Sequence, residues 1–132
     1  MLDRIDLHIE VPRVEHDKLS DKRIGEPSAL IRERIESARE NQLARFSQRD
    51  TESGMLTCNA DMRASHVRQS CELDDASNQL MRSAMRQMQL SARAYHRMLK
   101  LAHTIADLAD EQTITPQHLA EALQYRPKLG ID

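Results

Sequence analysis

The chain has 132 residues and a mass of 15.2 kDa, which is the size of one ordinary domain and leaves no room for two independent cores. Lysine and arginine number 19 against 21 aspartate and glutamate, so the formal charge of −2 excludes a polycation that coats nucleic acid or an anionic membrane. The three glycines lie too far apart for GxxxxGK[ST] or GxGxxG, so these residues contain no glycine-rich phosphate loop.

An alternating pattern opens the chain. Residues 5–11, IDLHIEV, alternate apolar with charged or polar side chains, which is the period of two expected of a half-buried strand that ends at Pro12. No later segment repeats the pattern, and a single strand cannot satisfy its own backbone hydrogen bonds. We therefore predict an orphan β-strand whose partners lie outside these residues, followed by a mixed, charged linker to about residue 26.

A long helix is predicted next. Proline suits the first position of a helix, so Pro27 and Ser28 mark a start, and the periodicity continues to about Phe46. The expected core-facing stripe consists of Ile31, Ile35, Ala38, Leu43 and Phe46. Residues 47–58 lose this period and contain a glycine among turn formers, which predicts a flexible loop.

The second half is predicted to be an all-α bundle. A short helix is expected over residues 64–71, and a clearer one opens at Asp74 or Asp75, where a carboxylate favours a helix N-terminus. Ser91 is the expected N-cap of the next helix, and Thr115 followed by proline announces the last. The methionines of the second of these helices, Met81, Met85 and Met88, are interpreted as core filler.

Basic residues are concentrated in the segment 76–106, which contains five cations and no acid. They are Arg82, Arg86, Arg93, Arg97 and Lys100. Such a cluster attracts phosphate, from a nucleotide or from a nucleic-acid backbone, because guanidinium gives a fixed fork of donors. The alternative is a solvated surface that pairs with acids elsewhere in the fold.

Two arginines stand out by position. Arg93 falls in the first turn after Ser91, where the helix dipole disfavours a cation by roughly 0.3 to 1 kcal/mol, so a nearby phosphate would explain it. Arg4 lies directly before the strand, where it can project toward a neighbour. The ordinary alternatives are an exposed arginine at 93 and an ion pair of Arg4 with Asp3 or Asp6.

Compartment and metal chemistry follow from what the composition lacks. No apolar run approaches the roughly 18 residues of a membrane span, and the N-terminus is unlike a signal peptide, so we expect a cytoplasmic protein without a membrane partner. Cys58 and Cys71 lack CxxC spacing and are expected to be reduced. With His66 they would still lack a fourth ligand, so no metal site is expected.

Four segments together resemble a known family. They are LDRIDLHIEVP, IRERIESARENQLARF, SARAYHRMLKLAHTIADLAD and ITPQHLAEALQYR. They resemble the C-terminal part of magnesium-chelatase-like AAA+ ATPases, in particular the ComM, or YifB-like, competence-protein subgroup, over nearly all of the chain except 47–58. The resemblance implies that residues 1–26 end the nucleotide-binding core and residues 27–132 form the helical lid. It also implies that Arg4 in LDRID matches the arginine finger, which acts in trans, and that Arg93 in SAR matches the sensor-2 arginine.

The same resemblance implies a larger parent protein. That parent has an N-terminal ATPase core, binds ATP and Mg²⁺, and forms a homo-oligomeric ring, expected to be a hexamer. It is expected to be a DNA motor that promotes branch migration, with magnesium insertion into a porphyrin as the alternative. The chain by itself is expected to hold no cofactor and to have no ATPase activity. A free-standing helical interaction module without a nucleotide role is the other class of hypothesis.

Overall fold

The computed structural model describes residues 4–47 and 56–126, and within them the fold is all-α. The helices are α1 (His16–Leu19), α2 (Ser28–Ser47), the 3-10 helix η2 (Asn59–Asp61), α3 (Ala64–Ser70), α4 (Asp75–Met88), α5 (Ala92–Leu108) and α6 (Pro116–Gln124). The predicted all-α bundle is confirmed. Most of the predicted loop at 47–58 and the last residues of the predicted lid lie outside the described residues.

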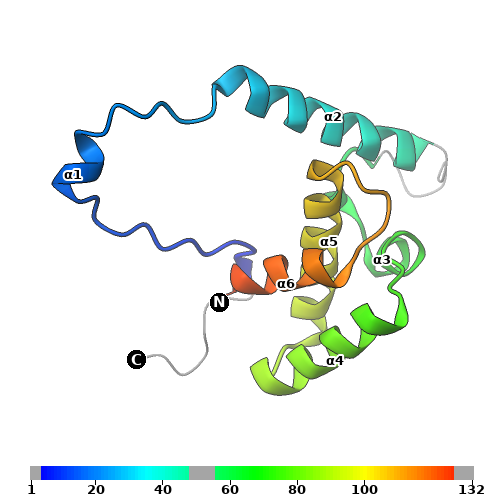
Figure 1. Ribbon diagram of the computed structural model, residues 1–132. Helices are drawn as coiled ribbons and strands as arrows, with labels where there is room; N and C mark the ends of the chain where they lie inside the picture. The colour runs from blue at the N-terminus through cyan, green and yellow to red at the C-terminus, as the bar shows by residue number, and fades with distance from the viewer. Residues whose placement is uncertain (1–3, 48–55, 127–132) are drawn as a thin grey trace.

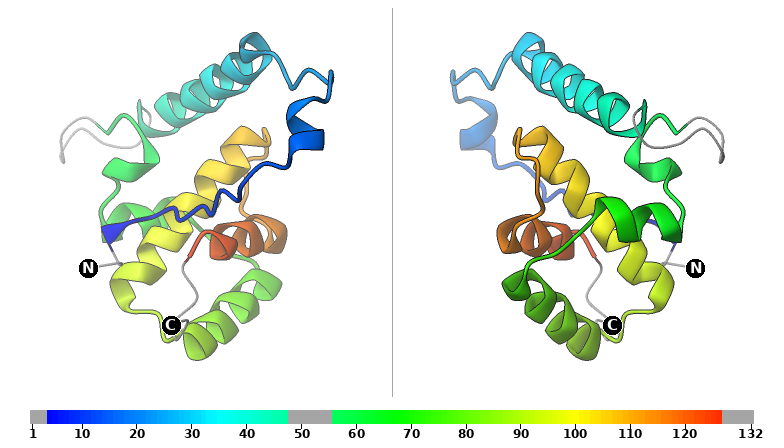
Figure 2. Two further views of the ribbon diagram at one scale, coloured as in Figure 1. Left: turned by 90° about the vertical axis from the view of Figure 1, so that its left-hand side faces the viewer. Right: turned by 90° about the vertical axis from the view of Figure 1, so that its right-hand side faces the viewer.

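Helix α5 forms the centre of the bundle. It packs against α2, α3, η2 and α6, and α4 packs on α6, so the second half of the chain closes around one helix (Figures 1 and 2). The apolar core is formed by residues of α2, α3, α4, α5 and α6 and of the connections between helices. Its buried members are Phe46, Met62, Val67, Cys71, Met81, Met98, Leu99, Ala102, Ile114, Leu119 and Ala122.

The helix starts occur where local chemistry predicts them. The Asp74 carboxylate accepts a hydrogen bond from the Ser77 amide at 2.7 Å and caps α4. The hydroxyl of Ser91 caps α5, and Thr115 caps α6 with proline in the first turn. Each cap satisfies a backbone N–H that the first helical turn leaves unpaired.

Helix α2 is only partly packed. Ala38 and Phe46, in its second half, are buried, whereas Ile31, Ile35 and Leu43 are exposed. The prediction that all five form a core stripe is therefore wrong for three of them. Ile31 and Ile35 are exposed because only the second half of α2 crosses α5, while its first half extends beyond the bundle (Figure 1). Leu43 lies in the second half and is 51% exposed, so it does not belong to the buried side of the helix that carries Ala38 and Phe46.

The N-terminal segment is not a strand. Residues 5–15 have no regular secondary structure, and α1 is a single turn without a buried residue, so the segment forms a wide open loop before α2 (Figure 1). No described residue offers a neighbouring strand, and a ladder cannot form without one. Its His8 amide instead donates to the carbonyl of Tyr125 at 2.8 Å, and Leu7 and Ile9 line a cavity of about 470 Å³ against α5 and α6. The predicted orphan strand is corrected to an extended, irregular segment.

Candidate functional site

The first turn of α5 presents Arg93 to solvent. Ser91 Oγ accepts a hydrogen bond from the Ala94 amide at 3.1 Å, which fixes the start of the helix directly before Arg93. The Arg93 side chain is exposed and has no hydrogen-bond or ion-pair partner among the described residues. The first turn also carries unpaired backbone donors and the positive end of the helix dipole. An uncompensated guanidinium beside these donors is suited to bind an anion such as phosphate.

Arg4 lies beside α5, where Arg97 holds its backbone. Arg97 Nη1 donates to the carbonyl oxygen of Arg4 at 2.6 Å and to Asp6 Oδ1 at 2.8 Å. Arg97 is one helical turn along α5 from Arg93, so the backbone of Arg4 and the candidate anion site lie on the same half of this helix. The Arg4 side chain is exposed. The alternative partner Asp6 binds Arg97 instead, and Asp3 lies outside the described residues.

The other predicted cations are divided between two environments. Arg82 and Arg86 are exposed on α4. Lys100, in contrast, donates from Nζ to the carbonyl of Ala60 in η2 at 3.4 Å, and Arg97 pairs with the N-terminal segment. Contacts of these residues with phosphate or nucleic acid remain a prediction.

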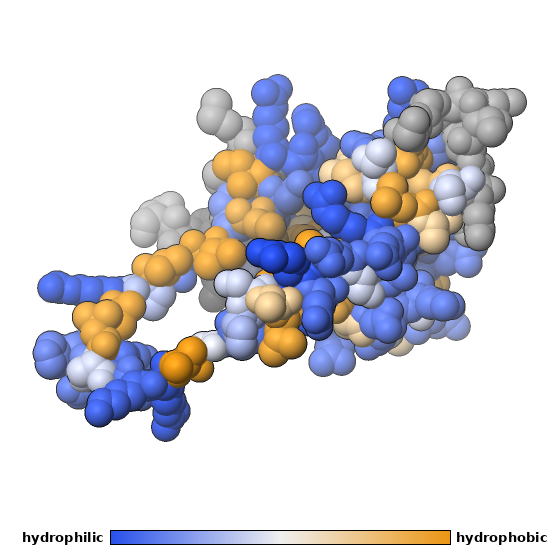
Figure 3. Space-filling model, turned by 90° about the horizontal axis from the view of Figure 1, so that it is seen from above, coloured by the Kyte–Doolittle hydropathy of each residue, from blue (hydrophilic) through white to orange (hydrophobic). Residues whose placement is uncertain are grey.

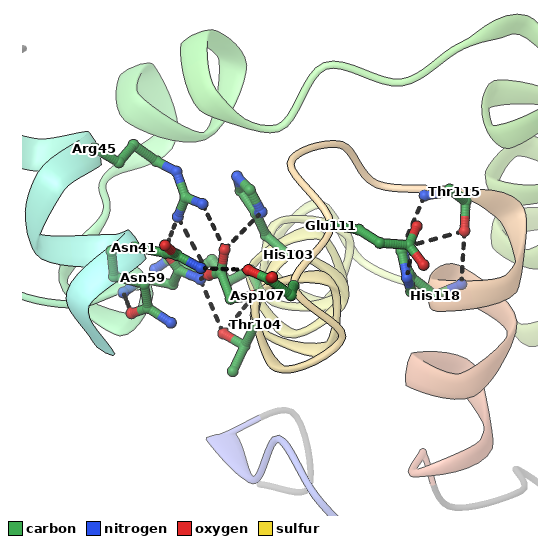
Figure 4. Close-up of polar contacts among 12 residues, drawn as sticks. Asn41, Arg45, Asn59, His103, Thr104, Asp107, Glu111, Thr115 and His118 are labelled. Atoms are coloured by element: carbon green, nitrogen blue, oxygen red, sulfur yellow. Dashed lines mark hydrogen bonds and ion pairs between the residues drawn. The ribbon is translucent and has the colours of Figure 1, made fainter. Parts of the chain in front are cut away.

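A buried polar network that sequence reasoning missed links α2, η2 and α5 (Figure 4). The Arg45 guanidinium binds both carboxylate oxygens of Asp107, at 2.5 Å from Nη2 and 3.3 Å from Nη1. Asn59 Nδ2 donates to Asp107 Oδ2 at 2.9 Å and to Thr104 Oγ1 at 3.0 Å, and its Oδ1 accepts from Arg45 Nη1 at 3.0 Å. The backbone N–H of Asn59 also donates a hydrogen bond to Gln42 Oε1 at 2.8 Å.

This network joins elements rather than forming a reactive site. Its carboxylate is fully paired, and the Asp107 side chain is 1% exposed although Arg45 and Asp107 also line a cavity of about 510 Å³. One signal in the sequence could have revealed it, because Asp107 directly follows Ala106 on the apolar face of α5. An acid at such a position requires a buried partner.

His103 lies against the same carboxylate. Its Nδ1 is 3.9 Å from Asp107 Oδ1, and the ring is buried. Burial lowers the pKa of His103, and the neighbouring Arg45 lowers it further, against an opposing effect of Asp107. The imidazole is therefore uncharged at neutral pH, and Arg45 is the counter-ion of Asp107.

The start of α6 is fixed by a second histidine. The Thr115 amide donates to His118 Nδ1 at 3.0 Å, so this nitrogen is unprotonated and the ring proton lies on Nε2, which is 3.6 Å from Glu111 Oε2 (Figure 4). Glu111 reaches this position because Asp110, with a φ of 58°, turns the chain at the end of α5. The arrangement is a capping motif in which histidine occupies the third position of the helix.

The described residues contain neither a cluster of metal ligands nor a helix suited to span a membrane. Within 4–47 and 56–126, no group of three or more histidine, cysteine, aspartate or glutamate side chains could hold a metal ion. Cys58 and Cys71 are both free thiols, and burial raises the pKa of Cys71 to about 12. None of the described helices has the length and apolar character that crossing a membrane requires.

The chain is similar in sequence to proteins from several bacteria. It is similar to competence protein ComM of Haemophilus influenzae, with 40% identity over 131 residues that cover 98% of this chain and 24% of that protein. It is also similar to the uncharacterized protein YifB of Escherichia coli, with 36% identity over 126 residues that cover 95% and 23%. YifB of Salmonella typhimurium is 33% identical over 126 residues, with coverage of 95% and 23%. The chain thus spans about a quarter of the length of these relatives.

A family match covers most of the described bundle. Residues 25–126, from the linker before α2 through α6, match the family described as magnesium chelatase, subunit ChlI C-terminal. The match includes α5 with Arg93 and Arg97 as well as the buried network around Asp107. This chain belongs to the magnesium chelatase ChlI C-terminal family.

Proposed function

We propose that this chain is the lid of a magnesium-chelatase-like AAA+ ATPase and that Arg93 is its sensor-2 arginine. The observation that carries the proposal is the position of Arg93, an exposed and uncompensated guanidinium in the first turn of the central helix α5. In the parent ring, Arg93 contacts the terminal phosphate of the ATP that its own subunit binds with Mg²⁺. Arg4 acts as the arginine finger on the nucleotide of the neighbouring subunit. Both cations stabilise charge that phosphoryl transfer develops on phosphate oxygens.

The exposed apolar residues before α2 support a second structural unit in the parent. Ile24 is 94% exposed, Val11 82% and Leu19 71%, and hydrophobic side chains follow the projecting segment (Figure 3). Apolar surface of this extent favours burial against a partner. We propose that the partner is the ATPase core, so that residues 1–26 belong to the core and the helices after them to the lid.

For the parent's substrate we propose DNA. The relative from Haemophilus influenzae is named a competence protein, and the exposed Arg82 and Arg86 on α4 offer positions for phosphate contacts. The parent would then be an ATP-driven ring motor that promotes branch migration. Porphyrin is the second candidate, which the family match over residues 25–126 favours.

The sensor role is tested in the full-length parent. Arg93→Ala should lower ATP turnover by about 10³-fold or more if the arginine stabilises charge in the transition state. Arg93→Lys should recover only part of the turnover, because an ammonium cannot reproduce the guanidinium fork. Arg68→Ala is the matched control, since Arg68 is an exposed arginine on α3 outside the proposed sites. Unchanged turnover in Arg93→Ala would refute the sensor role.

The assignment of Arg4 in trans is tested by mixing subunits. Rings of Arg4→Ala alone and of Arg93→Ala alone should both be inactive. Mixed rings contain some interfaces at which an intact Arg4 faces a subunit with an intact Arg93. Partial recovery of turnover in mixed rings supports the assignment, and complete absence of recovery contradicts it.

The substrate is tested by binding at several salt concentrations. If Arg82 and Arg86 contact DNA phosphates, each alanine substitution should reduce the slope of log affinity against log salt by about 0.9. Slopes equal to that of the unsubstituted parent would show that these residues do not contact DNA. A parent that binds porphyrin and no DNA would establish the second candidate.

A further inference from the structure

We propose that Arg97 is a positioning residue, which fixes the segment that carries Arg4 against α5. The same helix would then carry the sensor arginine and set the direction of the arginine finger. This inference rests on the function proposed above for Arg4 and Arg93. It assigns to Arg97 a role distinct from direct contact with phosphate.

The contact of Arg97 is made with the main chain of Arg4 itself. Its Nη1 donates to the Arg4 carbonyl oxygen at 2.6 Å and to Asp6 Oδ1 at 2.8 Å. The Arg97 side chain is 22% exposed, against 52% for Asp6. A hydrogen bond from a charged, partly buried guanidinium is stronger than one between neutral groups. Because it binds the Arg4 carbonyl on one side of Ile5 and the Asp6 side chain on the other, it restricts where the Arg4 side chain can point.

A second attachment lies two residues beyond Asp6. The His8 amide donates to the carbonyl of Tyr125, the residue that caps the end of α6, at 2.8 Å. Residues 4–8 are therefore tied to both α5 and α6. Within the described residues 9–25, in contrast, no hydrogen bond to the bundle is formed. The part of the segment that is hydrogen-bonded to the bundle is therefore the part that contains Arg4.

The spacing along α5 couples the two arginines. Arg93 and Arg97 are four residues apart and lie on the same face of the helix. If α5 moves as a rigid element, a displacement of Arg93 reaches Arg97 and, through its hydrogen bond, the backbone of Arg4. Phosphate contact at Arg93 in one subunit would thereby alter the finger that serves the next subunit. Arg97 is the link between the two sites.

The test is a double-substitution cycle in the parent ring. Arg97→Ala should lower turnover by on the order of 10- to 100-fold, the usual effect of misplacing a catalytic group, and should leave the KM for ATP unchanged. The double variant Arg4→Ala with Arg97→Ala should be no slower than Arg4→Ala, because Arg97 acts only through Arg4. Arg97→Lys should recover part of the turnover, and Arg68→Ala should have none of these effects. Independent, multiplicative losses in the double variant would overturn the proposal.

Hydrogen exchange on the 132-residue chain separates this inference from the proposed function. Arg97→Ala should accelerate exchange at the amides of residues 5–8 several-fold while the amides of α5 remain protected. Asp6→Asn is a second variant outside the core, and it should act in the same direction with a smaller effect. Unchanged exchange in both variants would overturn the positioning role. If exchange accelerates but Arg4→Ala leaves turnover unchanged, the segment is fixed as described and the finger assignment is what fails.

Discussion

Removing the Arg45 guanidinium should destabilise the bundle strongly, because it leaves the Asp107 carboxylate buried without a counter-ion. The Asp107 side chain is 1% exposed and that of Arg45 is 15% exposed. Solvation of the carboxylate by water therefore compensates little for the loss of the guanidinium. Removal of one partner from a buried pair costs about 3 to 5 kcal/mol. Asn59 still donates to Asp107 at 2.9 Å, which offsets part of the loss. We expect Arg45→Met to cost about 3 kcal/mol of unfolding free energy.

Two further variants decide whether this cost arises from the buried charge. Asp107→Leu combined with Arg45→Met removes both charges, and such double replacements are often close to neutral, so the double variant should be more stable than Arg45→Met alone. Arg34→Met is the matched control on the same helix. It breaks the ion pair between Arg34 and Glu26, whose side chains are 55% and 41% exposed, respectively. This substitution should lower the free energy of unfolding by less than about 1 kcal/mol.

Urea unfolding followed by far-ultraviolet circular dichroism at about pH 7.5 measures these differences. A loss of about 3 kcal/mol is a large part of the roughly 5 to 15 kcal/mol by which domains are stable, and it should shift the midpoint without a change in slope. The reasoning is refuted if Arg45→Met costs no more than Arg34→Met. It is equally refuted if the double variant is no more stable than Arg45→Met.

Titration, thiol reactivity and hydrogen exchange report on three other regions. Burial lowers the pKa of His103 in the folded chain below its usual value near 6.5, so the His103 ring binds a proton more readily in the unfolded chain. The free energy of unfolding measured in urea should therefore fall as the pH decreases from about 7.5 to about 5.5. His103→Gln should flatten that dependence, and an unchanged slope would contradict it. Burial raises the pKa of Cys71 to about 12, so a thiol reagent at about pH 8 should modify it more slowly than the half-buried Cys58, whereas equal rates would show that the site is open. Residues 9–26 should exchange their amide hydrogens rapidly, and protection throughout this segment would show that it has partners in the chain.

Local chemistry explains why the helix starts could be predicted. A side-chain cap acts on an amide two or three residues away, so Asp74, Ser91 and Thr115 define their helices whatever else the chain contacts. The candidate site was predictable to the same extent. Arg93 lies two residues after the cap Ser91, and its place in the first turn of α5 depends on that short-range relation.

Contacts between distant residues could not be predicted in this way. Which half of α2 is buried depends on where it crosses α5, so Ile31 and Ile35 share the sequence pattern of Phe46 without its burial. The alternation in residues 5–11 is typical of a strand, but a strand requires a neighbouring strand, and none lies among the described residues.

The polar contacts of the bundle depend most on the tertiary structure. Arg45 meets Asp107 across 62 positions, and Arg97 meets the Arg4 carbonyl across 93. Composition shows only that these charges exist. Their pairing is decided by how α5 packs against α2 and the N-terminal segment, because a charge leaves water only where the fold supplies its partner.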